Sequence, residues 1–363
     1  MKRLVFLLTV TVLLRAAVGA EWKTSEPGWR YEFPRDHAIH PDFKTEWWYF
    51  TGNLTGSRGE RYGYQLTFFR HGIRPRSQGD AELSRFVLRD LKFAHFTVTD
   101  AAGERFHFQQ NTSRGAFGEA GFNEGERLAW IDDWTLQLTS GGAFHLKASS
   151  EAAAIDLHLV SAKPPVIHGE NGVSKKAVGE GHASHYYSLT RLTTTGEVRV
   201  GDKALQVQGD SWFDHEWATN QLAEGQIGWD WLSVHFDDGA ELMLYQLRLS
   251  DGRADPTSSG TWVAPDGSSV HLPSSAFRMT PTAFWKSDRT PARYPIGWEI
   301  EVPGRGLRFT VRAAVEKQEL ALLPLAYWEG AVDVTGSRDG KAVVGRGYLE
   351  LTGYAGPLRE LSR

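Results

Sequence analysis

The sequence predicts an all-β protein built from many short antiparallel strands. Apolar side chains recur at every second position in stretches such as 62–68, 134–138 and 155–159, which is the pattern of strands with one buried face. Turn residues follow at short intervals, and four of the turns are Asp-Gly pairs, beginning at 238, 251, 266 and 339. Such a pair between alternating apolar residues is a strong hairpin signal. No long run has the period of an amphipathic helix, so we expect few, short helices.

Composition and turn spacing divide the chain into four segments. Residues 1–20 are predicted to be a signal peptide, and residues 21–45, with three prolines, a lead-in arm. Residues 46–195 and 196–363 are each expected to form one barrel, since about 150 residues suit an eight-stranded barrel that encloses a small cavity. The strands expected in the second barrel are 229–236, 241–249, 296–302, 307–315, 327–334 and 343–354.

The first twenty residues have the features of a secretory signal peptide. Lys2 and Arg3 precede an apolar run at 4–14, and the small residues at 18–20 supply a cleavage site. We therefore expect a secreted or periplasmic protein that is cut near Glu21. No other stretch approaches the ~20 apolar residues of a membrane-spanning helix, so we expect no integral membrane segment in the mature chain.

Charge and cysteine content exclude several classes of protein. Loss of the leader's three basic residues, Lys2, Arg3 and Arg15, changes the formal charge from −4 to −7. An acidic domain of this kind is a poor candidate for binding nucleic acid or anionic membranes. The chain has no cysteine, which excludes disulfides, thiolate zinc sites, cysteine nucleophiles and a lipid anchor on an N-terminal cysteine.

Two stretches combine acids with aromatic residues. Residues 209–231, GDSWFDHEWATNQLAEGQIGWDW, contain one histidine and four tryptophans among several acids, and residues 46–50 read EWWYF. A carboxyl group held among indole rings is costly to ionise, so its pKa rises and it becomes a candidate proton donor at neutral pH. The structural alternative is that the tryptophans are core and that the acids cap turns or pair with Arg70, Arg191 or Arg248.

Strand geometry divides these side chains between two faces. Asp230 is expected to point away from the tryptophans on either side of it, and Asp214 and Glu216 to point away from His215. If the Asp230 face lines a cavity, a lone carboxyl among apolar side chains suits a protonated acid. If that face is packed core, Asp230 needs a partner, because an unpaired buried polar group is costly.

Other kinds of site have little support in the sequence. The pairs His37/His40 and His182/His185 match no strong zinc pattern, and no His-Glu-x-x-His helix occurs. The chain has neither a Gly-x-Ser-x-Gly motif nor a glycine-rich phosphate loop between a strand and a helix. We therefore predict no metal and no cofactor.

Two runs, Glu-Trp-Trp-Tyr at 46–49 and Asp-His-Glu-Trp at 214–217, are together quite specific. The other motifs that count are His40-Pro41, Gly52, Leu66 to Arg70, His95, Lys163-Pro164, His168-Gly169, Tyr186 to Ser188, Thr190-Arg191, Gly209, Trp212-Phe213, Gly228 to Trp231, Tyr327 to Gly330 and Gly347 to Tyr354. With these motifs nearly the whole mature chain resembles the AttH-like family, which includes the bacterial carotenoid 1,2-hydratases and proteins described as predicted secreted hydrolases.

The resemblance implies two lipocalin-like β-barrel domains, in agreement with the strand pattern. The carotenoid hydratases are cofactor-free acid catalysts that protonate a terminal C=C bond and let water capture the tertiary cation. By this analogy Asp230 would be the acid, His215 would support it, and Asp214 would come next. Trp217 and Trp229 would stabilise a cation through their π faces. The residues expected to bind the ligand are Glu46, Trp47, Trp48, Trp217, Trp229, Trp231 and Tyr187.

These observations leave three hypotheses about function. The first is a secreted hydratase or hydrolase that acts on an apolar small molecule, such as a prenyl, polyene or lipid-like compound. The second is a non-catalytic carrier of a hydrophobic ligand that serves an ABC transporter, since some relatives are encoded beside transporter genes. The third is a purely structural role, in which the tryptophans fill the core and no internal cavity exists.

Overall fold

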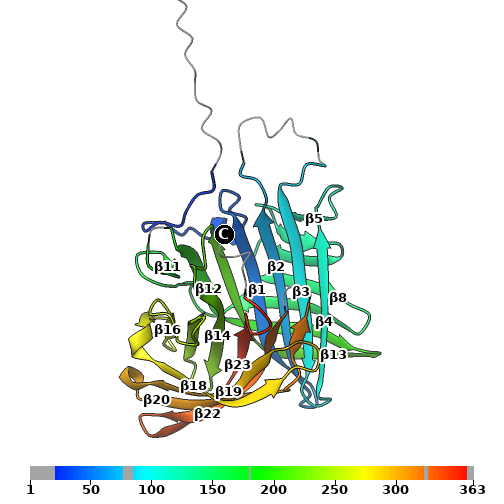
Figure 1. The fold of residues 1–363 in the computed structure, drawn as a ribbon. Helices are drawn as coiled ribbons and strands as arrows, with labels where there is room; N and C mark the ends of the chain where they lie inside the picture. The colour runs from blue at the N-terminus through cyan, green and yellow to red at the C-terminus, as the bar shows by residue number, and fades with distance from the viewer. Residues whose placement is uncertain (1–20, 77–83, 85, 180, 323–325, 358–363) are drawn as a thin grey trace, which may run out of the picture.

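The structure, a computed structural model, describes residues 21–76, 84, 86–179, 181–322 and 326–357 (Figure 1). It confirms the predicted all-β class, with two curled antiparallel sheets of the lipocalin-like kind. Helical structure in the described chain is limited to the short 3-10 turns η1 (Arg35–His37), η3 (Ser274–Ala276) and η4 (Pro303–Arg305). None of the helices found among these residues has the length and apolarity needed to cross a membrane. The predicted leader, 1–20, lies outside the described residues.

The first sheet has the strand order β4-β3-β2-β1-β13-β12-β9-β8-β7-β6-β5, and the short strands β10 and β11 pair with β12. Its strands are β1 (Thr45–Gly56), β2 (Arg61–Gly72), β3 (Asp90–Asp100), β4 (Arg105–Ser113), β5 (Ala120–Phe122), β6 (Arg127–Ile131), β7 (Trp134–Leu138), β8 (Phe144–Ser149), β9 (Ala153–Ser161), β10 (Val166–Ile167), β11 (Ser174–Lys175), β12 (Ala183–Val200) and β13 (Lys203–Ala218).

The second sheet has the order β17-β16-β15-β14-β23-β22-β20-β19-β18, and β21 pairs with β22. Its strands are β14 (Gln226–Phe236), β15 (Glu241–Leu249), β16 (Ser259–Val263), β17 (Ser269–Pro273), β18 (Arg278–Lys286), β19 (Arg293–Val302), β20 (Leu307–Ala313), β21 (Glu319–Ala321), β22 (Ala326–Arg338) and β23 (Lys341–Leu351). Neighbouring strands in sequence are mostly neighbours in the sheets, as the hairpin signals indicate.

The change from one sheet to the other comes after β13. The boundary predicted between residues 195 and 196 lies inside β12, and both β12 and β13 belong to the first sheet. The second sheet begins at Gln226 in β14. The chain therefore crosses between the sheets in the short segment 219–225, and the aromatic-rich stretch 209–231 contributes to both sheets.

Strand pairing places the two acid- and aromatic-rich runs side by side. β1 pairs with β13 along its whole length, so that Trp48 lies opposite His215 and Tyr49 lies opposite Asp214. β12 continues the ladder on the other side of β13, where Ser188 lies opposite Asp214. Residues that are far apart in sequence thus form one continuous patch of the first sheet.

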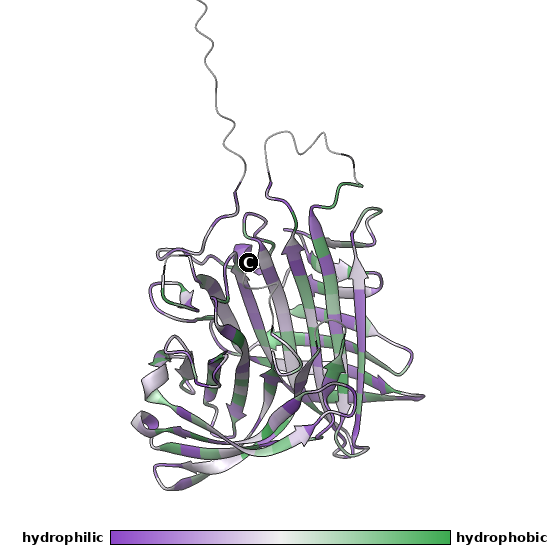
Figure 2. Cartoon of the chain, viewed as in Figure 1, coloured by the Kyte–Doolittle hydropathy of each residue, from purple (hydrophilic) through white to green (hydrophobic). Residues whose placement is uncertain are grey.

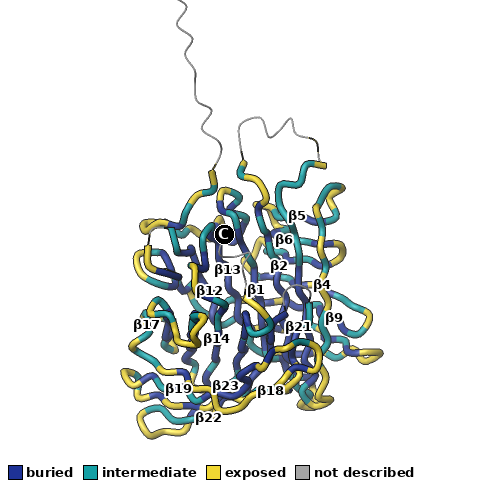
Figure 3. Tube along the Cα trace, viewed as in Figure 1, coloured by how far each residue is buried: buried dark blue, intermediate teal, exposed yellow. Residues whose placement is uncertain are grey.

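The apolar side chains that alternate along the strands pack into three separate clusters. One lies within the curl of the first sheet and contains Trp48 and Trp217, and one lies within the second sheet and contains Leu232 and Trp328. The third lies between the sheets and includes aromatic residues of both, namely Tyr49, Tyr186, Trp212, Trp231, Tyr245 and Tyr348. Polar and apolar residues alternate along many strands in Figure 2, and the buried strand centres contrast with exposed turns at the rim in Figure 3. The candidate site lies at the third cluster.

Candidate functional site between the two sheets

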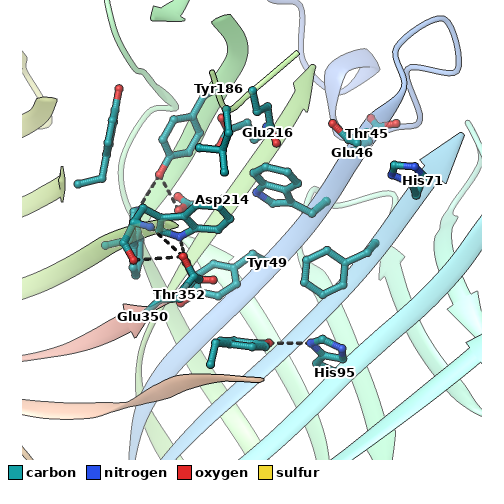
Figure 4. A pocket seen from close by; sticks show the side chains of 18 of the residues that line it. Thr45, Glu46, Tyr49, His71, His95, Tyr186, Asp214, Glu216, Glu350 and Thr352 are labelled. Carbon is teal, nitrogen blue, oxygen red and sulfur yellow. Dashed lines mark hydrogen bonds between the residues drawn. The ribbon is translucent and has the colours of Figure 1, made fainter. Parts of the chain in front are cut away.

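A cavity of about 310 Å³ lies between the sheets, and both sheets contribute to its wall (Figure 4). Most of the wall is apolar or aromatic. The aromatic residues that line it are Trp47, Tyr49, Phe69, Phe93, Tyr186, Trp229, Trp231, Tyr245 and Tyr327. Pockets of roughly 300 to 1,000 Å³ with this character and a few polar groups are typical sites for small molecules. The structural hypothesis, which requires that no internal cavity exists, does not fit this arrangement.

The Asp214 carboxyl group accepts three hydrogen bonds at the wall of the cavity. Its Oδ2 accepts a hydrogen bond of 2.7 Å from the Tyr186 hydroxyl, and its Oδ1 accepts one of 2.5 Å from Trp212 Nε1 and a further one from the Ser188 hydroxyl. Burial raises the pKa of Asp214 to about 7, although the three donors favour the carboxylate and oppose the rise. The group therefore changes its charge close to neutral pH.

Glu350 faces the same cavity from β23 in the second sheet. Its Oε2 accepts a hydrogen bond of 2.8 Å from Trp229 Nε1. Burial, together with the charges of Asp214 and Glu216, raises the pKa of Glu350 to about 7, while the Trp229 bond opposes the rise. Among the described residues, Glu350 Oε1 has no hydrogen-bond partner, so that oxygen is available to a ligand.

A buried ion pair forms another part of the wall. Lys176 Nζ lies 3.0 Å from Glu216 Oε1, and it sits 4.3 Å from the centre of the Tyr245 ring. Burial alone would lower the pKa of Lys176, but the charge of Glu216 raises it. The ion pair with Lys176 distinguishes Glu216 from Asp214 and Glu350, whose hydrogen-bond partners at this wall are uncharged donors.

Side-chain hydrogen bonds join the sheets beside the cavity. The hydroxyl of Tyr49, in the first sheet, donates to Glu329 Oε1 of the second sheet at 2.6 Å, and His95 Nδ1 lies 2.7 Å from the Tyr327 hydroxyl. Burial raises the pKa of Glu329 well above its usual value, and it lowers the pKa of His95 to about 4, so that His95 is neutral at pH 7. These hydrogen bonds fix the position of the first sheet relative to the second at the cavity.

The structure brings five of the predicted site residues to this cavity. Asp214, Trp47, Trp229 and Trp231 line it with their side chains. Glu46 also contributes to the wall, but its carboxylate is occupied by hydrogen bonds with His40, His215 and Arg70 on the other face of β1. The division follows strand geometry, because neighbouring side chains of β1 point to opposite faces.

Asp230, the acid assigned by analogy, does not line the cavity. Its side chain points to the opposite face of β14 from Trp229 and Trp231, where Arg248 forms an ion pair with it and the Tyr354 hydroxyl donates a hydrogen bond of 2.9 Å. Asp230 is fully buried, and burial raises its pKa to about 6 against the effect of Arg248. Asp230 thus has the partners expected of a packed carboxylate on one oxygen, and it is absent from the lining of this cavity.

Four other predicted residues lie together inside the curl of the first sheet. His215 Nε2 is 3.0 Å from Glu46 Oε1, and its Nδ1 is 2.9 Å from the Asp36 carbonyl oxygen. Trp48 stacks on His215, Trp217 stacks on His40 with ring centres 3.7 Å apart, and the Tyr187 hydroxyl bonds to His37. His215, Trp48, Trp217 and Tyr187 thus form a second polar and aromatic cluster, separate from the cavity.

Sequence reasoning missed Glu350, Tyr186, Glu216 and Lys176 as members of the site. A signal for Glu350 was present, because it lies in the motif Gly347 to Tyr354 and alternates with Leu349 and Leu351. Its hydrogen-bond partner, Trp229, could not be foreseen, since only the pairing of β14 with β23, in which Trp231 lies opposite Glu350, brings the two side chains together. Lys176 lies in a segment without a strand pattern, and only the fold carries it to Glu216.

A family model described as AttH-like matches residues 24–354, which is nearly all of the described chain. The chain belongs to the AttH-like family. A crystal structure from Nitrosomonas europaea that carries the AttH name is 32% identical, with a TM-score of 0.82, and the match covers 92% of this chain and 99% of that one. This agrees with the family resemblance of the sequence motifs.

More distant relatives of this AttH-like chain have named enzyme activities. The dehydratase asqC of Emericella nidulans is 24% identical over 231 residues, and the match covers 57% of this chain and 60% of the dehydratase. Kievitone hydratase of Nectria haematococca has the same fold, with a TM-score of 0.71 at 13% identity, and the match covers 93% of this chain and 97% of that enzyme. The fold of this chain is thus shared with an enzyme named as a hydratase.

Proposed function

We propose that this AttH-like protein is a hydratase or dehydratase, which adds water to or removes water from an apolar small molecule in the cavity between the sheets. The observation that carries the proposal is the pair Asp214 and Glu350, two carboxyl groups with pKa values of about 7 in one largely aromatic cavity. Groups tuned to neutral pH are the ones suited to general acid–base catalysis.

The hydrogen bonds of the two carboxyl groups support different roles for them. Glu350 has one donor on Oε2, and in its protonated form it can deliver a proton from Oε1 to a C=C bond. Asp214 accepts bonds from Tyr186, Trp212 and Ser188, which stabilise its carboxylate form. As a carboxylate it can take a proton from water as the water oxygen bonds to carbon.

The wall supports a cationic intermediate on the substrate. Proton transfer to a C=C bond leaves a carbocation, and the faces of Trp47, Trp229 and Trp231 at the wall can stabilise positive charge. Addition of water then gives an alcohol, and the proton gained by Asp214 returns to Glu350 through solvent. Dehydration follows the same steps in reverse. Protonated Asp214 gives its proton to the hydroxyl group, which leaves as water, and the Glu350 carboxylate takes a proton from the carbon next to the cation.

Two further observations favour this class of reaction. The dehydratase of Emericella nidulans is similar in sequence to this chain, and its name supports a reaction in which water is removed. The apolar wall favours a substrate with a hydrocarbon skeleton, because burial of apolar surface contributes about 25 cal/mol per Å² to binding. A prenylated or polyene compound has both the apolar skeleton and the C=C bond.

Identification of the bound molecule tests the proposal and separates it from the carrier hypothesis. The protein is purified from its own cells and extracted with organic solvent, and the extract is analysed by mass spectrometry. We expect a polyene, prenylated or fatty-acyl compound whose hydrated or dehydrated form appears when it is returned to fresh protein. Recovery of one compound that remains chemically unchanged on incubation would instead favour a carrier.

We also propose that the protein acts outside the cytoplasm, in the periplasm or the medium, as the predicted leader indicates. N-terminal sequencing of the protein from its own cells should give a chain that begins near Glu21. A chain that begins at Met1 and fractionates with cytoplasmic proteins would contradict export.

A further inference from the structure

The second polar cluster, inside the curl of the first sheet, contains three groups that can ligate a metal ion. His40 from the lead-in arm, Glu46 from β1 and His215 from β13 each offer one atom, and the three atoms all lie within 4.8 Å of one another. Glu46 Oε1 is 2.8 Å from His40 Nδ1 and 3.0 Å from His215 Nε2. All three residues are buried.

The outer nitrogen of each histidine faces a hydrogen-bond acceptor. His215 Nδ1 lies 2.9 Å from the carbonyl oxygen of Asp36, and His40 Nε2 lies 3.3 Å from the carboxylate Oδ1 of Asp36. Metal-binding histidines almost always donate their outer N–H to a carbonyl or carboxylate in this way, which turns the lone pair of the inner nitrogen toward the ion.

The three atoms that face one another are His40 Nδ1, His215 Nε2 and Glu46 Oε1, and the number of protons available to them leaves a place for a cation. A neutral imidazole has a single N–H, and if the outer nitrogens carry it, both inner lone pairs point at Glu46 Oε1, which is itself an acceptor. Protonating His40 alone, between Asp36 and Glu46, still leaves His215 with one N–H for two acceptors. Protonating both rings would bury two imidazolium cations with ring centres 5.4 Å apart, which is costly away from solvent. A metal ion between the three atoms satisfies all of them at once.

We propose that His40, Glu46 and His215 form a binding site for a divalent first-row transition-metal ion. An ion about 2.1 Å from each ligand atom would see Glu46 Oε1 and each nitrogen at about 85–90°, given the separations of 2.8 and 3.0 Å. Right angles and a set of two imidazoles and one carboxylate favour octahedral ions such as Fe²⁺, Mn²⁺, Co²⁺ or Ni²⁺ over tetrahedral Zn²⁺.

The surroundings provide support and access for the ion. Arg70 Nε lies 3.3 Å from Glu46 Oε2, so it holds the carboxylate by the oxygen that does not face the histidines. His40 and Asp36 also line a surface groove of about 490 Å³, which gives the ion a route from solvent. The site is separate from Asp214 and Glu350, so it does not depend on the proposed hydratase activity.

Metal content of the mature protein, purified without a histidine tag, tests the site. The protein is treated with chelator and dialysed against each ion, and bound metal is measured by mass spectrometry. We expect one ion per chain, loss of the ion in His215→Ala and Glu46→Ala, and affinity about 10–100-fold weaker in Asp36→Asn, because Asp36 supports a ligand without binding the ion.

His145→Ala is the matched control. His145, Asp156 and His158 form the other ligand-like group among the described residues, but they lie at the surface and Asp156 is paired with Lys147. We expect this variant to bind metal like the wild type. Loss of the ion in His145→Ala, with retention in His215→Ala, would overturn the proposal.

A measurement on the unaltered protein covers the case in which the buried variants misfold. Electron paramagnetic resonance of one equivalent of bound Cu²⁺ should show coupling to two imidazole nitrogens. A wild-type protein that retains no ion at one equivalent, or that binds copper without nitrogen coupling, would show that the cluster is held together by protons alone and would overturn the proposal.

Discussion

The indole N–H of Trp229 donates a hydrogen bond of 2.8 Å to Oε2 of Glu350, joining β14 to β23 at the wall of the cavity. The bond fixes the carboxyl group and favours its ionised form, so it lowers the pKa. Burial and the charges of Asp214 and Glu216 outweigh it and bring the pKa of Glu350 to about 7. Tuned in this way, Glu350 can hold a proton in the resting protein and release it to a substrate.

Substitution of Glu350 by Gln should abolish most of the turnover of the compound recovered from the protein. The amide keeps the shape of the side chain but cannot donate a carboxylic proton, and loss of a general acid typically costs about 10²–10⁴-fold in rate. Asp214→Asn should have an effect of similar size, because it removes the base. Both variants should bind the compound, as measured by quenching of tryptophan fluorescence.

The control for these variants is Glu197→Gln, a change of the same kind on the exposed face of β12. It should leave turnover and binding unchanged. Turnover by Glu350→Gln at the rate of Glu197→Gln would remove Glu350 from the mechanism.

The rate of hydration should show a bell-shaped dependence on pH, with its maximum close to pH 7. Activity requires protonated Glu350, so it falls as pH rises through the pKa of the acid, and it requires ionised Asp214, so it falls as pH drops below the pKa of the base. Trp229→Phe removes the N–H that stabilises the Glu350 carboxylate. The pKa of Glu350 should rise, and the alkaline limb should move to higher pH.

Trp231→Phe is the comparison for the pH profile. Its indole N–H bonds to the Tyr186 hydroxyl at 3.1 Å and not to Glu350, so this variant should leave the alkaline limb in place. An alkaline limb that moves equally in both variants, or in neither, would show that the Trp229 bond does not set the pKa of the acid.

Stability should fall as pH rises from about 4 to 7, because of the same carboxyl groups. The pKa of Asp214 is about 7 in the folded protein, whereas an aspartate in an unfolded chain has a pKa of about 3.8. The unfolded chain therefore releases this proton first and binds fewer protons across that range. The favourable contribution is complete below pH 4 and is lost by about pH 7. Asp214→Asn should therefore flatten the slope by up to about 1.4 kcal/mol per pH unit.

Urea unfolding of the wild type and of Asp214→Asn at several pH values between 4.5 and 7.5 measures the two slopes. Glu197→Gln again serves as the control, since it should keep the wild-type slope. Identical slopes in the wild type and in Asp214→Asn would mean that Asp214 titrates in the folded protein as it does in the unfolded chain.

The sequence predicted the class of fold because alternation is a local property. The stretch 62–68 shows it directly, with Tyr62, Tyr64, Leu66 and Phe68 buried in β2. The point at which the chain passes to the second sheet could not be predicted from the sequence. β12 and β13 form a long hairpin, and only their pairing with β9 and β1 shows that both belong to the first sheet.

The site was predicted in part, for a related reason. Asp214, Trp229 and Trp231 could be selected because acids and tryptophans are adjacent in the sequence. Alternation alone could not say which face of β14 meets the other sheet, so Asp230 was selected with its neighbours although it points to Arg248. The proposed metal site requires residues of three separate segments, His40, Glu46 and His215, and no spacing in the sequence predicts that these lie together.

Asp230→Asn should destabilise the protein but leave ligand binding in the cavity intact. The change leaves the Arg248 guanidinium buried without its counter-charge, and removing one partner of a buried ion pair typically costs about 3–5 kcal/mol. Thermal unfolding should show a clear fall in Tm, while the compound still binds and is still turned over below that temperature. Normal stability with complete loss of turnover would instead restore Asp230 as the catalytic acid.

The most direct test of the central claim is a reaction in ¹⁸O-labelled water. The purified protein is incubated in labelled water with the hydrophobic extract of its own cells, and all compounds are compared by mass spectrometry with a parallel reaction that contains Glu350→Gln. We predict that at least one compound gains one labelled water, or loses water, only with the wild-type protein. An extract that is unchanged by the wild type, or changed equally by Glu350→Gln, would contradict acid-catalysed hydration or dehydration in this cavity.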